Sequence, residues 1–375
     1  MSPLVGVKAY GWQWSEDHGL TMAQAAQRMA SHGVDWAMVQ NLIDPLPGSA
    51  VAQAPPAGSY SDAGWVNVLR DQGIRTYQST AALFSPDAFR AREDLRPIGS
   101  DGEVFTPLTW YYGICPSAED YLTAKAERFA EAVAATQPDG VFLSFLRFPG
   151  FWELWLPGDS RQDIVEYCFC DRCTGLFEER TGISLPGGGP RARASVLTHD
   201  LRAEWTAFKC ARVAEIAGRL RIAATEVKPD IDVTLNSFGL GSTDFGNAVE
   251  EVLGQRFGDL DPVIDTYELM FYFQIQNRDP HTWIPQRVAE VRRLTDRRVL
   301  ACLQGGAEYL EDVYAAGGRA REITATQWRQ ALTGVAVSGA DGVLIYSWKD
   351  LLDDEAGGGT RVPDLLAYRA GDLRG

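Results

Sequence analysis

The segment Gln137-Pro138-Asp139-Gly140-Val141-Phe142-Leu143-Ser144-Phe145-Leu146-Arg147-Phe148 contains a turn followed at once by a run of mostly apolar residues. A helical pattern precedes the turn, and the apolar run is typical of a buried strand. The same order recurs along the chain, as at Ser31-His32-Gly33 and Asp71-Gln72-Gly73. Glycine just past a helical pattern is an expected helix stop. The repetition predicts alternating helices and strands, and therefore a parallel sheet.

Eight segments carry the strand pattern, and longer helical patterns lie between most of them. The strands are expected at residues 4–14, 34–41, 74–83, 140–148, 231–238, 263–273, 299–304 and 342–348, and the helices at 21–31, 63–72, 118–136, 203–227, 283–294 and 326–337. Eight such units in 375 residues predict one (β/α)8 TIM barrel domain over residues 1–375. A doubly wound sheet is the alternative, but no glycine-rich phosphate loop follows the first strand.

The connections between these elements differ in length. Helix-to-strand turns are short, whereas long strand-to-helix segments occupy residues 44–61, 84–116, 149–201 and 305–322. In a TIM barrel these βα loops lie at the C-terminal ends of the strands, where catalytic groups gather. The long βα loops are therefore expected to form the walls and lids of a pocket.

Composition excludes several classes of protein. The chain has 11 Trp, 13 Tyr and 16 Phe, too much apolar mass for a disordered protein. Its net charge of −15, with no basic block, argues against nucleic acid as a partner. No apolar run is long enough for a membrane helix, so no membrane partner is expected either. The first residues, Met1-Ser2-Pro3-Leu4-Val5-Gly6, show no signal-peptide pattern, and we expect a cytoplasmic protein.

Three cysteines lie close together in Cys168-Phe169-Cys170-Asp171-Arg172-Cys173. In a reducing compartment disulfides are the weaker explanation, and thiolates at this spacing suit a tetrahedral zinc ion. Cys115, in the neighbouring βα loop, is expected to supply the fourth ligand. With four protein ligands the zinc would be structural, and no organic cofactor is expected. Cys210 and Cys302 fall inside a helix and a strand and are interpreted as core residues.

These features resemble known families. One cysteine in an early loop and a C-x-C-x2-C run after the fourth strand are similar to the β-galactosidases of glycoside hydrolase family 42. Residues 139–149 resemble the "DG-(hydrophobic)-x-LDxIRxP" fourth strand of glycoside-hydrolase-like barrel proteins. Their "D-x-x-x-x-M-x-Y" and "DG-v-x-x-(F/Y)-x-W" segments are similar to residues 265–272 and 341–348. The resemblance implies a barrel that acts on carbohydrate.

One position departs from that pattern. The resembled barrels carry an aspartate where this chain has Ser144, and in related hydrolases that aspartate is a catalytic carboxylate. Glu268 shares strand parity with Met270 and Tyr272, so it is expected to point into the barrel beneath them. The resembled barrels usually carry a small or uncharged residue at the position of Glu268, so we expect that one carboxylate is lost from the fourth strand and another gained on the sixth.

Glycoside cleavage needs two carboxyl groups, one of them held protonated. Glu153, among the aromatic residues of Phe151-Trp152-Glu153-Leu154-Trp155, is the first candidate for the general acid; the alternative is a solvated loop residue. Glu268 is the second candidate, with a buried ion pair, for example to Lys8, as its alternative. Asp44, before Pro45, is held in reserve, and it is equally explained as a turn cap.

Other residues at the predicted strand ends fit sugar recognition. Flat aromatic rings stack on the apolar faces of sugars, and amide or cationic groups bind hydroxyls or carboxylates. The candidates for substrate binding are Trp12, Trp14, Arg147, Trp152, Asn236, Tyr272, Gln304, Trp348 and Lys349.

The favoured function is a glycoside hydrolase that acts on a small glycoside or oligosaccharide through a pair of carboxylates at the barrel mouth. Two alternatives remain open: a sugar-binding barrel that has lost catalysis at Ser144, and another sugar-processing barrel enzyme, an isomerase or a lyase. The sequence leaves the oligomeric state open.

Overall fold

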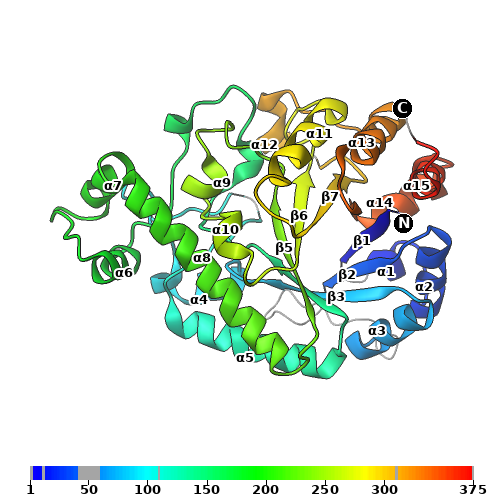
Figure 1. Ribbon diagram of the computed structural model, residues 1–375, viewed down its shortest axis with the longest axis horizontal. Helices are drawn as coiled ribbons and strands as arrows, with labels where there is room; N and C mark the ends of the chain where they lie inside the picture. The colour runs from blue at the N-terminus through cyan, green and yellow to red at the C-terminus, as the bar shows by residue number, and fades with distance from the viewer. Residues whose placement is uncertain (1–2, 11–12, 41–59, 109, 309–310, 374–375) are drawn as a thin grey trace.

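The predicted strands form and close into a barrel. The computed structural model describes residues 3–10, 13–40, 60–108, 110–308 and 311–373. Each strand pairs in parallel with its neighbours in sequence, and β8 pairs with β1 to close the barrel (Figure 1). The strands are β1 (Leu4–Tyr10), β2 (Trp36–Gln40), β3 (Arg75–Ala81), β4 (Gly140–Ser144), β5 (Asp232–Phe238), β6 (Thr266–Phe271), β7 (Arg298–Gln304) and β8 (Gly342–Tyr346). The (β/α)8 prediction is confirmed.

Several strands are shorter than the sequence predicts. β4 ends at Ser144 rather than at residue 148, and β6 ends at Phe271 rather than at residue 273. β1 ends at Tyr10, and the chain is already helical from Gln13. Beyond β4 and β6 the apolar run continues because Leu146, Phe148 and Phe273 are buried in the core although they lie outside the strands.

The helices agree with the predicted ranges to within a few residues at most ends. The six predicted helices are α2 (Met22–Ser31), α3 (Asp62–Asp71), α5 (Glu119–Thr136), α8 (Arg202–Thr225), α11 (Pro280–Val291) and α13 (Ala325–Ser338). Thr21 and Thr324 form capping boxes at the starts of α2 and α13. Gly339 ends α13 with a φ of 80°, a left-handed conformation that glycine adopts without strain.

The remaining helices lie mostly within the βα connections or follow the last strand. They are α1 (Gln13–Glu16), α4 (Pro86–Ala91), α6 (Asp171–Thr181), α7 (Pro190–His199), α9 (Ala248–Glu251), α10 (Phe257–Leu260), α12 (Glu311–Tyr314), α14 (Trp348–Ala356) and α15 (Arg361–Ala370), with 3-10 turns at Glu93–Leu95, Trp152–Leu154, Arg161–Asp163 and Ala315–Gly317. In Figure 1, α6 and α7 project to the left of the barrel beside α8.

Two buried layers hold the barrel. Outward residues such as Val5 and Val7 of β1 pack against the surrounding helices, whereas inward residues such as Trp36 and Tyr77 fill the interior. The rings of Trp36 and Tyr77 lie 4.8 Å apart, centre to centre. A Cβ atom at Gly6 would collide with the Trp36 ring, so glycine there leaves room for this aromatic floor.

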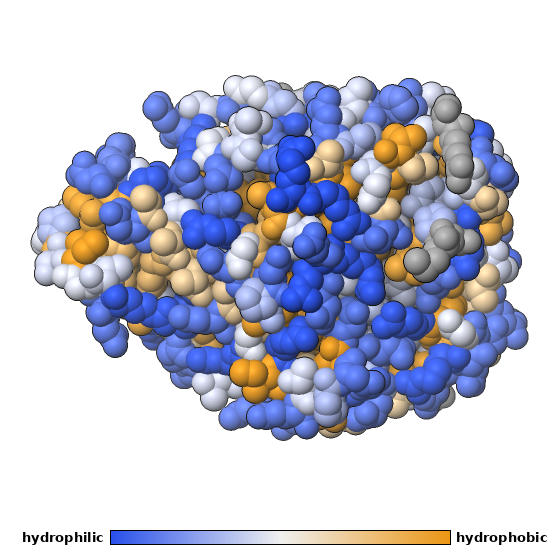
Figure 2. Space-filling model, in the orientation of Figure 1, coloured by the Kyte–Doolittle hydropathy of each residue, from blue (hydrophilic) through white to orange (hydrophobic). Residues whose placement is uncertain are grey.

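The outer surface is mostly polar. Figure 2 shows hydrophilic residues over most of the visible face, with hydrophobic residues in small patches. In the described part of the chain, no helix is both long and apolar enough to cross a bilayer.

Candidate active site

The barrel has a cavity of about 400 Å³ at the C-terminal end of its strands. Strand residues form its base, and residues of the βα loops form its walls. The strands contribute Lys8, Met38, Ser79, Phe142, Ser144, Asn236, Met270 and Tyr346, and the loops contribute Phe84, Trp110, Phe145, Arg147, Trp152, Glu153, Tyr272, Ile275, Glu308 and Tyr314. Five of the predicted site residues are brought together here: Arg147, Trp152, Glu153, Asn236 and Tyr272.

Glu153 is an acid buried in the wall of this cavity. It lies in the 3-10 turn Trp152–Leu154 after β4 and is 6% exposed. Its Oε2 has no hydrogen-bond partner among the described residues. Burial raises the pKa of Glu153 to about 7, against the opposing charges of Arg147 and Arg319. The carboxyl group can therefore hold a proton near neutral pH, as the sequence predicts for a general acid.

Arg319 fixes the position of this acid. Its Nη2 donates to the main-chain carbonyl of Glu153 at 2.5 Å, and its Nε donates to the carbonyl of Ile275 at 2.7 Å. One buried guanidinium thus joins the βα loops that follow β4, β6 and β7. Because Arg319 contacts Glu153 through its main chain, the side chain of Glu153 remains available to line the cavity.

Glu268 lies deeper, within the barrel. It is fully buried on β6, as its strand parity predicts, and its Oε1 lies 3.1 Å from Nζ of Lys8 on β1. Asn236 of β5 donates to its Oε2. This geometry matches the alternative interpretation of Glu268, a buried ion pair with Lys8. Lys8 also donates to the Tyr272 hydroxyl at 3.2 Å.

Glu308 is a second carboxyl group of the cavity lining, which the sequence analysis missed. It lies four residues after the end of β7, and its Oε1 accepts a hydrogen bond from the Tyr346 hydroxyl at 2.9 Å. The side chain of Glu308 reaches solvent at the mouth. Partial desolvation by the surrounding protein nevertheless raises the pKa of Glu308, against the lowering effect of the hydrogen bond from Tyr346. Glu153 and Glu308 both raise the pKa of Tyr314, after the larger effect of burial, so both carboxyl groups lie near that side chain. The signal available in the sequence was an acidic residue just beyond a predicted strand end.

Aromatic rings form one wall of the cavity. Tyr272 stacks on Tyr346 with ring centres 5.0 Å apart, and Trp152 lies 5.9 Å from Tyr272. Phe145 and Phe84 also line the cavity, and their rings stack at 4.6 Å. Flat apolar faces with nearby amide and hydroxyl groups are suited to bind a sugar ring.

Four predicted binding residues lie outside the cavity lining. Trp348 begins α14 instead of ending β8; it is fully buried, and its Nε1 donates to His32 Nδ1 at 3.4 Å. Trp14, in α1, stacks on Trp65 in the core at 4.8 Å. Lys349 forms ion pairs with two aspartates of the surface, Asp17 and Asp353.

Gln304 is the fourth of these residues, and it acts on the loop after β6. Fully buried at the end of β7, it accepts from the main-chain N–H of Gln274 at 3.1 Å and donates to the side chain of the same residue. It therefore supports the loop that carries Ile275. The two remaining candidates, Trp12 and Asp44, lie outside the described residues.

The four predicted metal ligands come together beside the barrel. The sulfur atoms of Cys115, Cys168, Cys170 and Cys173 all lie within 4.8 Å of one another, and all four residues are buried. Cys115 Sγ lies 3.5 Å from Cys170 Sγ and 3.6 Å from Cys173 Sγ. These separations are too long for a disulfide and close to the roughly 3.8 Å edge of a tetrahedron with 2.3 Å metal–sulfur bonds. The cluster could hold a metal ion.

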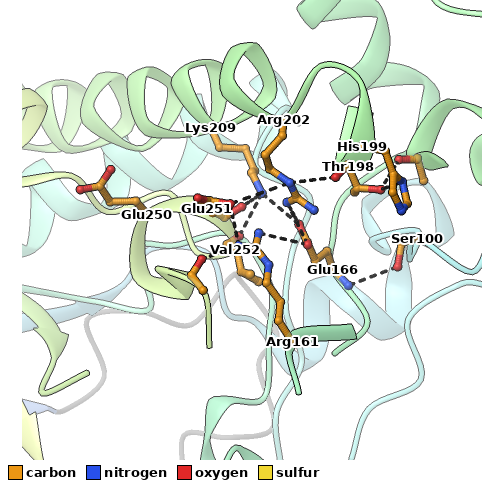
Figure 3. Close-up of polar contacts among 12 residues, drawn as sticks. Ser100, Arg161, Glu166, Thr198, His199, Arg202, Lys209, Glu250, Glu251 and Val252 are labelled. Atoms are coloured by element: carbon orange, nitrogen blue, oxygen red, sulfur yellow. Dashed lines mark hydrogen bonds and ion pairs between the residues drawn. The ribbon is translucent and has the colours of Figure 1, made fainter. Parts of the chain in front are cut away.

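A buried network of charges anchors the loop that carries three of these cysteines (Figure 3). Glu166 accepts from Arg202 Nη1 at 2.9 and 2.8 Å, and it also pairs with Arg161 at 3.4 Å and with Lys209 at 3.5 Å. Lys209 also donates to the main-chain carbonyl of Val252. The network joins the loop after β4 to α8 and to the segment around α9.

Comparisons with known proteins agree with this architecture. No protein-family model matches the chain, and no curated protein matches it in sequence. The glycoside hydrolase domain of PgaB (BpsB) from Bordetella bronchiseptica is similar over 98% of both chains, with a TM-score of 0.69 and 15% identity. A β-galactosidase from the Antarctic haloarchaeon Halorubrum lacusprofundi has a TM-score of 0.67 and 16% identity over 98% of this chain and 57% of its own. For Gan42B, a GH42 β-galactosidase from G. stearothermophilus, the TM-score is 0.69 and the identity 12%, over 100% and 57% of the two chains.

The chain thus spans just over half the length of these β-galactosidases. At identities this low the similarity shows the fold. The prediction of a glycoside-hydrolase-like TIM barrel is confirmed at that level.

Proposed function

We propose that the protein hydrolyses a glycosidic bond in a small glycoside or oligosaccharide, with Glu153 as the general acid. The observation that carries the proposal is the carboxyl group of Glu153, buried in the cavity wall with a pKa raised to about 7. A protonated carboxylic acid can give its proton to the leaving oxygen as the glycosidic bond breaks. The solved glycoside hydrolases with the same fold support this reaction class.

Glu308 is proposed as the second carboxylate, in place of Glu268. Glu308 belongs to the cavity lining, whereas Glu268 lies beneath it and is engaged by Lys8 and Asn236. The two lining carboxyl groups come from the loops after β4 and β7. In this role Glu308 either attacks the anomeric carbon or activates a water molecule, depending on its separation from Glu153.

The sugar is proposed to bind against the aromatic lining of the cavity. Trp152 and Tyr272 offer ring faces, and Asn236 offers an amide to hydroxyl groups. This assigns to three of the predicted residues the binding role that the sequence suggested.

One observation favours a second candidate function, a sugar-binding protein without catalysis. Ser144 lines the cavity at the position where the resembled barrels carry an aspartate, and its hydroxyl donates to the carbonyl of Thr80 at 3.1 Å. If that aspartate were indispensable, this chain would bind sugar and leave it intact.

The cysteine cluster is proposed to hold a structural zinc ion. Four thiolates supply the full tetrahedral set of a structural site and leave no open position for substrate. The ion would fasten the loop after β3, through Cys115, to the loop after β4, which carries the other three ligands. Six free cysteines suit a reducing compartment, in keeping with a cytoplasmic protein.

A panel of nitrophenyl glycosides and natural oligosaccharides, assayed with purified protein, tests the proposal. We expect turnover of at least one sugar class, with losses of about 100-fold or more in kcat for Glu153→Gln on a natural oligosaccharide and for Glu308→Gln on any substrate. Glu127→Gln, on the exposed face of α5, is the matched control. Sugar binding by calorimetry without turnover of any compound would favour the binding protein instead.

A further inference from the structure

Arg147 is a buried cation in the cavity wall. It is 2% exposed, and it follows β4 three residues after the end of the strand. Its Nη2 donates to the carbonyl of Gly150 at 3.3 Å, while its Nε is buried and has no acceptor among the described residues. The guanidinium also lies 5.3 Å from the ring centres of Tyr111, Phe145 and Phe238.

The other cations near the cavity have their partners. Lys8 is paired with Glu268, and Arg319 donates to two main-chain carbonyls. Glu153 is close enough for the charge of Arg147 to oppose the rise of its pKa, but within the described part of the chain no carboxylate lies within ion-pairing distance of Arg147. A buried charge without a counter-ion is unfavourable, so the arrangement is more stable when a ligand supplies the anion.

The position of Arg147 indicates where that anion belongs. Arg147 lines the same cavity as Glu153, Trp152 and Tyr272. A sugar that binds on the aromatic wall therefore lies in the cavity that the guanidinium also lines. A guanidinium presents planar, parallel N–H donors, whose geometry matches a carboxylate. The chain carries a net charge of −15, which repels anions at a distance, but screening confines that effect to about 8 Å at physiological salt. Within the cavity, the nearby positive charge of Arg147 therefore favours an anionic ligand over a neutral one.

We propose that the substrate sugar carries a carboxylate group, as in a uronic acid glycoside, and that Arg147 binds it. The inference rests on the proposed function, because it specifies the substrate of the same cavity. It goes further in naming a charged sugar, whereas the lining aromatics alone suit any pyranose.

Calorimetry with pairs of methyl glycosides that differ only in the carboxylate tests the inference: methyl glucuronoside against methyl glucoside, and methyl galacturonoside against methyl galactoside. At pH 6 we expect one uronoside to bind about 10- to 100-fold more tightly than its neutral counterpart, as a charge-assisted hydrogen bond predicts. Arg147→Gln should abolish that preference. Arg147→Lys, which keeps the charge and loses the planar fork, should retain part of it. Arg180→Gln, on α6 and paired with Glu215, should leave it unchanged.

The preference for a uronoside is measured on the parent protein, so the test remains valid even if Arg147→Gln folds poorly. Binding of neutral sugars as tight as that of both uronosides, or binding of neither uronoside, overturns the inference. Tighter binding of a sulfated sugar also overturns it, since it would assign a different anion. Hydrolysis of neutral glycosides alone would keep the proposed function and reject the inference. Arg147-dependent uronoside binding without any hydrolysis would reject the proposed function and keep the inference.

Discussion

The ammonium group of Lys8 on β1 lies 3.1 Å from the carboxylate of Glu268 on β6, so an ion pair spans the interior of the barrel. Both side chains are almost fully buried. Removal of one charge from such a pair leaves the other without compensation, at a cost of about 3–5 kcal/mol. We expect Glu268→Gln to lower the free energy of unfolding by about that amount, measured by urea denaturation.

A double variant separates this structural role from a catalytic one. Lys8→Met combined with Glu268→Leu removes both charges and should recover much of the lost stability. If Glu268→Gln instead folded as stably as the parent and lost turnover, Glu268 would be the second catalytic carboxylate, as the sequence first suggested.

The raised pKa of Glu153 predicts how activity depends on pH. The acid must be protonated to act, so kcat/KM should fall as the pH rises through about 7, where Glu153 ionises in the folded enzyme. In Glu153→Gln the remaining activity should lack this alkaline limb. The loss should be smallest for nitrophenyl glycosides, because good leaving groups need little protonation. An alkaline limb unchanged in the variant would assign it to another group.

The same pKa also predicts a change in stability. The native state keeps the Glu153 proton up to about pH 7, whereas the unfolded chain releases it near the ordinary value of 4.5. Stability contributed by this group is therefore present at low pH and lost as the pH rises towards 7, by up to about 3 kcal/mol. Glu153→Gln should gain stability relative to the parent between pH 5 and pH 8, measured by urea denaturation at both values. Glu127→Gln should show no such gain.

The cysteine cluster predicts a dependence on metal. Elemental analysis of protein purified without chelator should find about one zinc ion per chain. Cys170→Ser should lose the zinc and lower the melting temperature, because the loops after β3 and β4 are then no longer fastened together. Cys210→Ser, a buried cysteine of α8 outside the cluster, should keep the zinc. Equal zinc content in the parent and in Cys170→Ser would contradict the assignment.

The network around Glu166 predicts a second point of loop attachment. Glu166→Gln leaves the buried Lys209 without its carboxylate, whereas Arg161 and Arg202 keep their contacts with Glu251, and we expect a loss of about 3 kcal/mol in stability. Hydrogen exchange should then speed up in residues 161–170. Glu311→Gln removes one side of an exposed pair with Arg321 and should cost less than about 1 kcal/mol.

The sequence was sufficient for the barrel because each strand–helix unit carries its own local signals. The apolar run at β4 and the capping threonines of α2 and α13 act within a few residues of each other. The strand-end rule also predicted Glu153 and Arg147 near the barrel mouth, and both side chains line the cavity there.

The rule failed where a strand ended early or a loop folded back. Trp348 was expected at the end of β8, but the chain enters α14 at that residue and buries its ring in the outer core. Glu308 was missed because the loop after β7 has no periodicity that would reveal which side chains face the cavity. Its contact with Tyr346 depends on the complete tertiary fold.

The contacts of Arg319 have a consequence for how this site can diverge. Arg319 recognises the main-chain carbonyls of Glu153 and Ile275, atoms that every amino acid at those positions provides. Substitution at position 153 or 275 therefore changes the chemistry of the cavity without removing the bonds that hold its loops together. A barrel built in this way can acquire new specificities through single side-chain changes while its loop framework is inherited intact.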